Sequence, residues 1–151
     1  MLETLGLASF LKTTGGKGLH VVVPILPRAE WKVCLEFSRA LAEAIERHDP
    51  AKYTTAFAKS GRERKILIDY LRNNRTNTSV AAFSTRARKG APVSMPIRWE
   101  ALTPALNPAS WTVLTAERRL SSLRGDPWKD YWTTKQQLSR KATTALAAIH
   151  T

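Results

Sequence analysis

The sequence has one cysteine, few acidic residues and no long apolar run, and each of these shortages excludes a class of protein. With Cys34 alone, the chain forms no internal disulfide, which indicates an intracellular protein. No apolar run approaches the roughly 20 residues that a membrane-spanning helix needs. The first residues also lack the basic region and apolar core of a signal peptide. We therefore expect a cytoplasmic protein with no membrane partner.

The shortage of acidic residues leaves a strongly basic chain. Its 12 aspartates and glutamates face 24 lysines and arginines, which gives a net charge of +12. An excess of this size on a small domain indicates a polyanionic partner, most often nucleic acid. Basic residues concentrate at 59–75 and 86–89, whereas the acids lie mostly at 30–49. This asymmetry favours one basic face over an even spread of charge.

The order of the predicted elements is typical of an α+β fold with a mixed or antiparallel sheet and flanking helices. Residues 31–48 are the strongest helix prediction, because apolar positions recur at helical spacing. The predicted apolar face consists of Trp31, Cys34, Leu35, Leu41, Ala42 and Ile45. Strands are expected at 9–14 and 19–24, joined as a hairpin, and at 65–71 and 80–84, with an extended segment at 90–98. Further helices are expected at 2–8, 99–102, 108–111, 115–123 and 129–149.

The stretch KTTGGKGLHVVVP, residues 12–24, combines glycines, a lysine and a histidine ahead of an apolar run. It matches neither the P-loop pattern nor GxGxxG. Even so, glycine backbone amides can face an anion without a Cβ in the way. Thr14, Lys17 and His20 would add a hydroxyl, a point charge and an imidazole donor for a triphosphate. The alternative is an ordinary tight turn with an exposed lysine.

Asp69 lies inside the apolar run KILIDYL. A buried carboxylate there would be costly without a cation or hydrogen-bond donors. Three readings remain open: an ion pair with Arg72, an exposed position on a half-solvated strand, or a ligand for Mg²⁺ or Mn²⁺, which prefer carboxylate oxygens.

Two long motifs, FLKTTGGKGLHVVVP and ILIDYLRNNRTNTSVAAFSTRARKGAPVSMPIRWEAL, are followed by DPW near residue 127. In this order they resemble the polymerase domain of bacterial DNA ligase D, a member of the archaeo-eukaryotic primase superfamily, from about residue 5 to about residue 130. The resemblance implies template-dependent nucleotidyl transfer from NTP or dNTP onto DNA, with Mn²⁺ or Mg²⁺, during double-strand break repair by end joining.

The same resemblance assigns roles to individual residues. It implies that Asp69 is the catalytic carboxylate and metal ligand. It also implies that five residues contact the nucleotide and its phosphates: Thr14, Lys17, His20, Arg72 and Arg86.

One feature of the family is missing from the chain. The family's other two metal ligands form an Asp-x-Asp pair upstream of the glycine loop, and this sequence contains no Asp-x-Asp. We therefore expect residues 1–151 to be a single partial domain, the C-terminal portion of the polymerase domain. A second chain carrying the N-terminal half or a ligase module would complete it. Two-metal chemistry needs several carboxylates, so whether this chain is an enzyme by itself stays open. The alternatives are a non-catalytic basic module that binds DNA or nucleotides and a truncated remnant.

Overall fold

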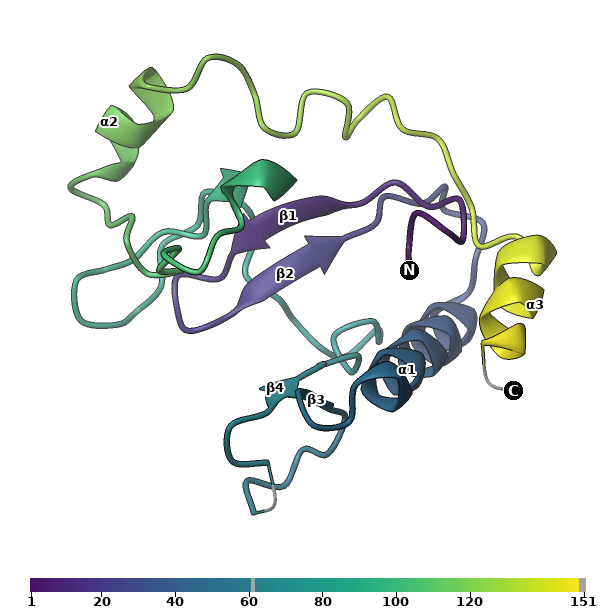
Figure 1. The fold of residues 1–151 in the computed structure, drawn as a ribbon. Coiled ribbons are helices and arrows are strands. Elements are labelled where there is room, and N and C mark those ends of the chain that lie inside the picture. Colours follow the sequence, from purple (N-terminus) through teal and green to yellow (C-terminus); the bar gives the residue numbers. More distant parts are fainter. Residues whose placement is uncertain (61, 150–151) are drawn as a thin grey trace.

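A three-stranded antiparallel sheet forms the centre of the computed structural model, which describes residues 1–60 and 62–149 (Figure 1). Its strands are β1 (Phe10–Thr13), β2 (Leu19–Val22) and β5 (Pro96–Ile97), in the order β2-β1-β5. The hairpin predicted around the glycine loop is confirmed, with Lys12 opposite His20 in its register.

A separate pair of very short strands follows the first helix. β3 (Tyr53–Thr54) and β4 (Ile66–Leu67) lie parallel to each other. The strand expected over 65–71 is therefore mostly wrong, because it ends at Leu67. Asp69 lies beyond its end, where Leu71 N–H donates to the Asp69 carboxylate and begins a turn.

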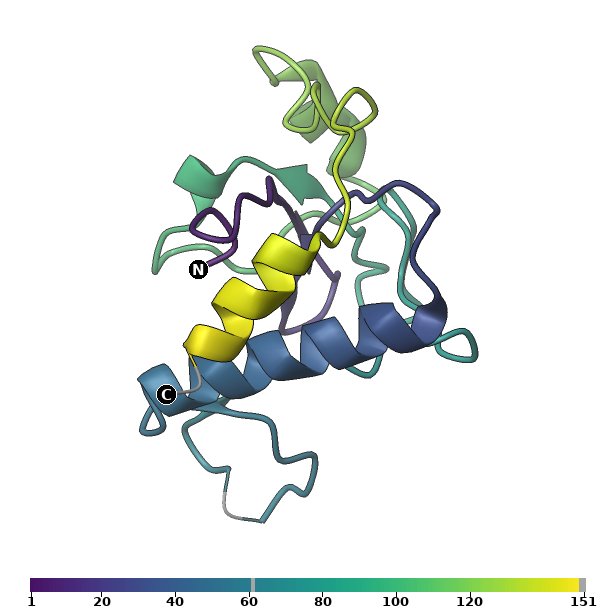
Figure 2. The same cartoon turned by 90° about the vertical axis from the view of Figure 1, so that its right-hand side faces the viewer.

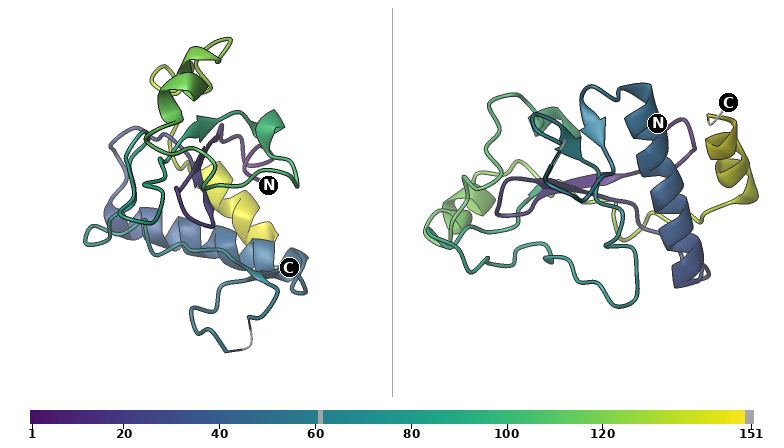
Figure 3. Two further views of the ribbon diagram at one scale, coloured as in Figure 1. Left: turned by 90° about the vertical axis from the view of Figure 1, so that its left-hand side faces the viewer. Right: turned by 90° about the horizontal axis from the view of Figure 1, so that it is seen from below.

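The described residues contain one long helix and three shorter helical elements. α1 (Trp31–His48) has the predicted bounds, and α3 (Arg140–Ala148) lies across it (Figure 2). The 3₁₀ helix η1 (Trp99–Ala101) and the short helix α2 (Ala116–Ser121) follow β5. α2 lies at the end of the molecule away from α3 (Figure 3). Within the described residues, no helix has both the length and the apolar character to cross a membrane.

The apolar face of α1 differs in part from the prediction. Ala42 is buried as expected, but Trp31 is 56% exposed, and the remaining buried positions of the helix are Phe37 and Ala44. The first turn of α1 is not covered, because the buried cluster meets the helix further along, at Phe37 and Ala44. The core cluster around α1 comprises Leu5, Leu7, Phe37, Ala44, Ala142 and Leu146.

A second buried group surrounds the sheet. Leu11, Met95 and Ile97 are each at most 1% exposed. Thr13 lies among them, and its hydroxyl accepts a hydrogen bond from Met95 N–H at 2.9 Å. β1 is therefore fixed on both sides, which holds the adjoining glycine loop in a defined position.

The long terminal helix expected over 129–149 is wrong in its first half. The side-chain amide of Gln136 pairs with the backbone of Ala8 in both directions, at 2.9 and 2.8 Å. The backbone carbonyl of Gln136 accepts from Leu26 N–H at 2.8 Å. Trp128 donates to the Leu11 carbonyl and stacks on Tyr131, with ring centroids 4.8 Å apart. These long-range contacts hold the segment in turns and extended backbone, so only the final turns are helical.

Three other predicted elements are also turns or irregular backbone. Residues 2–8 form turns, in which Leu5 N–H bonds to the carbonyls of Met1 and Leu2. Residues 108–111 turn around the Asn107 side chain, which accepts from Ala109 N–H. Residues 80–84 do not form a strand because Phe83 has a φ of +63°.

Candidate functional site

The loop between β1 and β2 is closed by its own threonine. Both the N–H and the hydroxyl of Thr14 donate to the Gly18 carbonyl, at 3.1 and 2.9 Å. The hydroxyl predicted to contact a phosphate is thus engaged within the loop. Thr14 shapes the turn, and its hydroxyl can reach a ligand only by exchanging this bond.

Gly15 lies where only glycine fits. It is buried, its φ is +63°, and a Cβ there would lie 2.9 Å from Arg86 Cγ and 3.1 Å from the Pro92 carbonyl oxygen. Within the described residues, the backbone N–H groups of Gly15, Gly16 and Lys17 have no hydrogen-bond acceptor. The loop therefore offers a row of amide donors, as the glycine-rich pattern predicts.

His20 is the centre of a cationic cluster. Burial is the main cause that lowers its pKa to about 4, and the charges of Lys12, Arg72 and Arg86 lower it further. Asp69 acts in the opposite direction, toward a higher pKa. The structure thus brings four of the six predicted site residues, His20, Asp69, Arg72 and Arg86, within electrostatic reach of one another.

Asp69 and Arg72 form an ion pair, as one of the open readings proposed. Arg72 Nε lies 3.3 Å from Asp69 Oδ2, and Arg72 Nη1 donates to the Thr78 carbonyl at 3.0 Å. The Asp69 side chain remains 35% exposed, so a solvent cation can reach it. Arg72 thereby ties the carboxylate to the loop that follows it.

Arg86 connects the loop to the cluster. Its Nη1 donates to the Thr14 carbonyl at 3.3 Å, and its backbone N–H donates to the Pro92 carbonyl at 2.8 Å. Since the side-chain stem contacts the Gly15 position, the guanidinium is held at the base of the glycine turn. This geometry suits a group that clamps a phosphate.

Lys12 is a site residue that the sequence reasoning missed. It is 5% exposed, and its ammonium donates to the Val80 carbonyl and to Ser94 Oγ. Burial lowers its pKa to about 8, and Arg86 contributes in the same direction. No local pattern in FLKT marks this lysine, because its burial among Leu11 and Thr13 depends on the pairing of β1 on both sides.

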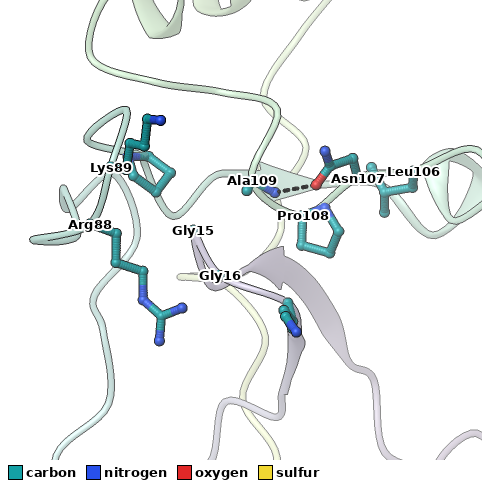
Figure 4. Close-up of a pocket in the computed structure, with 10 residues that line it drawn as sticks. Gly15, Gly16, Arg88, Lys89, Leu106, Asn107, Pro108 and Ala109 are labelled. Carbon is teal, nitrogen blue, oxygen red and sulfur yellow. Dashed lines mark hydrogen bonds between the residues drawn. The ribbon is translucent and has the colours of Figure 1, made fainter. Parts of the chain in front are cut away.

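Lys17, by contrast, lies apart from this cluster. It does not contribute to the lowered pKa of His20. It lines a cavity of about 470 Å³ with Arg88 and Lys89 instead (Figure 4). The structure therefore divides the predicted phosphate contacts between two adjacent places.

The described residues do not supply a complete metal site. Across 1–60 and 62–149, no group of three or more His, Cys, Asp or Glu side chains could hold an ion. Asp69 contributes one carboxylate, whereas Mg²⁺ and Mn²⁺ take about six ligands, mostly oxygens. The residues that the structure describes therefore do not by themselves fit a resident metal ion.

Comparison with known proteins identifies relatives over most of the chain. The family model described as "LigD, primase-polymerase domain" matches residues 1–128. The multifunctional non-homologous end joining protein LigD of Pseudomonas aeruginosa is 41% identical over 140 residues, 92% of this chain and 17% of that protein. The bifunctional LigD of Bacillus subtilis is 28% identical over 137 residues, 90% of this chain and 22% of its own length.

A solved structure has the same fold. The polymerase domain of Mycobacterium tuberculosis Ligase D, in complex with DNA, superimposes with a TM-score of 0.76 at 29% identity. The match covers 85% of this chain and 44% of the mycobacterial one. The predicted α+β class is confirmed. The chain spans about a fifth of the length of the two full-length relatives.

Proposed function

The chain belongs to the LigD primase-polymerase family, and from this premise we propose that it binds nucleoside triphosphate and DNA as part of a template-dependent nucleotidyl transferase in end joining. The observation that carries the proposal is the cationic cluster around His20. Lys12, Arg72 and Arg86 create a potential there that opposes protonation of the imidazole. A polyphosphate relieves this potential, because its negative charge offsets three cations that, among the described residues acting on His20, are opposed by Asp69 alone.

Each residue of the cluster has a role that its geometry suits. Arg86 and Arg72 offer planar guanidinium donors that match phosphate oxygens in pairs. His20, neutral at pH 7, donates an N–H to a phosphate oxygen and carries no charge of its own. Buried Lys12 contributes a fixed positive charge beneath them. Asp69 supplies one metal ligand, and a partner chain would have to supply the other carboxylates.

The experiment that tests the proposal is a calorimetric titration of Mn²⁺-ATP into the full chain. We expect saturable binding to the wild type and its loss in the double variant His20→Ala with Arg86→Ala. Arg39→Ala is the matched control, because Arg39 lies on the exposed side of α1 and pairs with Glu43. Equal binding by the wild type and the double variant would contradict the proposal.

A second function, a non-catalytic basic module, is favoured by a different observation. The chain carries a net charge of +12, and its described part has no carboxylate cluster. Under this alternative the chain binds DNA at its phosphates, with a steep dependence on salt, and never extends a primer. A primer-extension assay with and without a separately produced N-terminal half of a related polymerase domain separates the two functions. A bacterial location at the nucleoid would follow from either.

A further inference from the structure

Ser94 is a buried serine beside the central strand β1, and its hydroxyl bridges two neighbouring residues of that strand. The residue is 0% exposed. Its hydroxyl donates to the Thr13 carbonyl at 2.6 Å. Because a hydroxyl has only one proton, its oxygen lone pairs are left to accept, and the Lys12 ammonium donates to them at 3.3 Å. Ser94 therefore holds Lys12 with an acceptor whose orientation is fixed from the other side.

The oxygens that hold the Lys12 ammonium are neutral. Besides Ser94 Oγ, the ammonium donates to the Val80 carbonyl, and among the described residues no carboxylate forms an ion pair with it. Burial is the main cause that lowers its pKa to about 8, so Lys12 is mostly protonated at pH 7. A carboxylate partner would offset this charge, whereas hydroxyl and carbonyl oxygens leave it in force.

The charge of Lys12 acts on the residue that faces it across the hairpin. Lys12 lies opposite His20 in the register of β1 and β2. After burial, the charge of Lys12 is the strongest of the causes that lower the His20 pKa. The place of the Lys12 ammonium therefore sets part of the positive potential that an anionic ligand meets at the His20 cluster.

The backbone of Ser94 fixes the loop that leads to Arg86. Ser94 N–H donates to the Ser84 carbonyl at 2.9 Å, and Phe83 N–H donates to the Ser94 carbonyl at 2.7 Å. Phe83 has a φ of +63°, a left-handed conformation that a bulky residue rarely adopts without support. Ser94 thus connects β1, which carries one cation of the cluster, with the loop that carries another.

We propose that Ser94 is a positioning residue of the triphosphate site, whose hydroxyl holds the Lys12 ammonium in place near His20 without neutralising it. The inference rests on the proposed function, in which the His20 cluster takes the triphosphate. Ser94 is buried and acts through Lys12, so its hydroxyl matters for triphosphate binding only while the ammonium is present. An alanine at this place would offer no acceptor, and an aspartate would put an opposing charge beside the ammonium.

A serine that only supported the fold would behave differently. Its hydroxyl also bonds to the Thr13 carbonyl, and loss of that bond would have the same effect with or without Lys12. The two roles are separated by removing the Ser94 hydroxyl and the Lys12 ammonium singly and together. Residues that belong to one network then show non-additive effects.

The first test is a double-mutant cycle measured by calorimetric titration of Mn²⁺-ATP into the full chain. The variants are Ser94→Ala, Lys12→Met and the two combined. Coupling within one hydrogen-bond network commonly changes an affinity by about fivefold, so we expect Ser94→Ala to weaken binding by about fivefold in the wild-type background and by less than about twofold in the Lys12→Met background.

Ser139→Ala is the matched control for lost stability. The Ser139 hydroxyl also bonds to the backbone, since it accepts from Ala142 N–H at 3.1 Å at the start of α3. Its removal deletes a helix cap and lowers the free energy of unfolding. We expect the affinity for Mn²⁺-ATP to stay unchanged, which separates lost stability from lost positioning.

A second measurement needs no nucleotide. An exposed ammonium exchanges its protons rapidly with water, whereas a buried and hydrogen-bonded one is protected. We expect a nitrogen-15 NMR signal from the Lys12 ammonium at pH 6, identified by its absence in Lys12→Met, that broadens or disappears in Ser94→Ala. If Ser94→Ala does not fold, Ser94→Cys takes its place, because sulfur is a weaker acceptor and should also broaden the signal.

Equal weakening by Ser94→Ala in both backgrounds would overturn the inference, since the serine would then act independently of Lys12. An unchanged Lys12 ammonium signal in the Ser94 variant would overturn it as well. Absence of Mn²⁺-ATP binding in the wild type overturns the proposed function and the role of Ser94 with it. Wild-type binding that Ser94→Ala leaves unchanged overturns the role of Ser94 alone.

Discussion

The imidazole of His20 lies between three positive charges and one negative charge, and this sets its protonation. Burial and the charges of Lys12, Arg72 and Arg86 together lower its pKa to about 4, from an ordinary value of 6.5. The residue that the family resemblance assigns to the triphosphate is therefore a neutral hydrogen-bond donor at pH 7. Under the proposed function, His20 would recognise a phosphate through the direction of its N–H, while the arginines and Lys12 would provide the positive charge.

We predict that His20 titrates near pH 4 in protein free of metal and nucleotide. Between pH 6.5 and 4 the unfolded chain binds a proton on this residue that the folded chain does not, so its contribution to stability is lost as the pH falls through that window. Lys12→Met should raise the His20 pKa by removing the strongest of the lowering charges. Nitrogen-15 NMR titration in the presence of EDTA measures both values, with Arg39→Gln as a control. A wild-type pKa of 6.5 or higher would contradict the prediction.

Lys12 gives a second prediction, at the opposite end of the pH scale. Its pKa is lowered from 10.5 to about 8, so between these values the unfolded chain holds a proton that the folded chain has released. The free energy of unfolding should therefore rise with pH across this window, at about 1.4 kcal/mol per unit of full pKa separation.

In Lys12→Met this rise should be absent. The measurement is urea denaturation of both proteins at several pH values between about 8 and about 10. Taking the difference between the two profiles removes the contribution of every other titrating group. Parallel profiles would show that Lys12 keeps its ordinary pKa in the folded chain.

At the scale of elements, the glycine turn is the feature with the strictest requirements. Gly15 and Gly6 both have positive φ, at +63° and +72°, but only Gly15 is crowded. A Cβ at Gly6 meets nothing within 4 Å, whereas one at Gly15 meets Arg86 Cγ at 2.9 Å and the Pro92 carbonyl oxygen at 3.1 Å. The two positions form a matched pair for separating backbone strain from steric collision.

We predict that Gly6→Ala costs about 1 kcal/mol of folding free energy, which is the left-handed backbone alone. Gly15→Ala should cost at least about 1 kcal/mol more, because the Pro92 backbone cannot move aside freely. Urea denaturation of both variants provides the comparison. If the two substitutions cost the same, the hairpin tip does not pack on the loop 86–92 as described.

Several elements could be predicted from the sequence because their signals are local. The hairpin follows from β-branched residues on both sides of a glycine turn, and α1 follows from its helical spacing and the Asp49-Pro50 stop. Residues 129–139 could not be predicted in this way. Their conformation depends on Gln136 bonding to Ala8 and on Trp128 bonding to Leu11, contacts that no local pattern encodes.

Part of the candidate site could likewise be predicted from the sequence, and part of it could not. That His20, Asp69, Arg72 and Arg86 serve one site was implied by the family motifs, and the structure places them together. Lys12 was missed because a lysine in a strand is normally assigned to the solvent face. Its burial follows from β1 being the central strand, paired on both sides, which only the sheet order shows.

At the scale of the whole molecule, metal binding is the most informative property. Asp69 is the carboxylate of the His20 cluster, and the described residues contain no group of three or more potential ligands. We predict that the chain binds Mn²⁺ weakly without nucleotide, and that Asp69→Asn changes this binding little. Electron paramagnetic resonance of free Mn²⁺ measures it, with Glu36→Gln as a control on the exposed face of α1. A tight, saturable site lost in Asp69→Asn would show that other residues complete the coordination.

The core around α1 joins segments that are far apart in the chain. Leu5 and Leu7 come from its first residues, Phe37 and Ala44 from α1, and Ala142 and Leu146 from α3. During translation the ribosome releases the first two groups well before the last. The apolar face of α1 must therefore wait, uncovered, until α3 has left the exit tunnel. The same sequence order that builds this core late leaves an apolar surface of the nascent chain open to water until α3 is released.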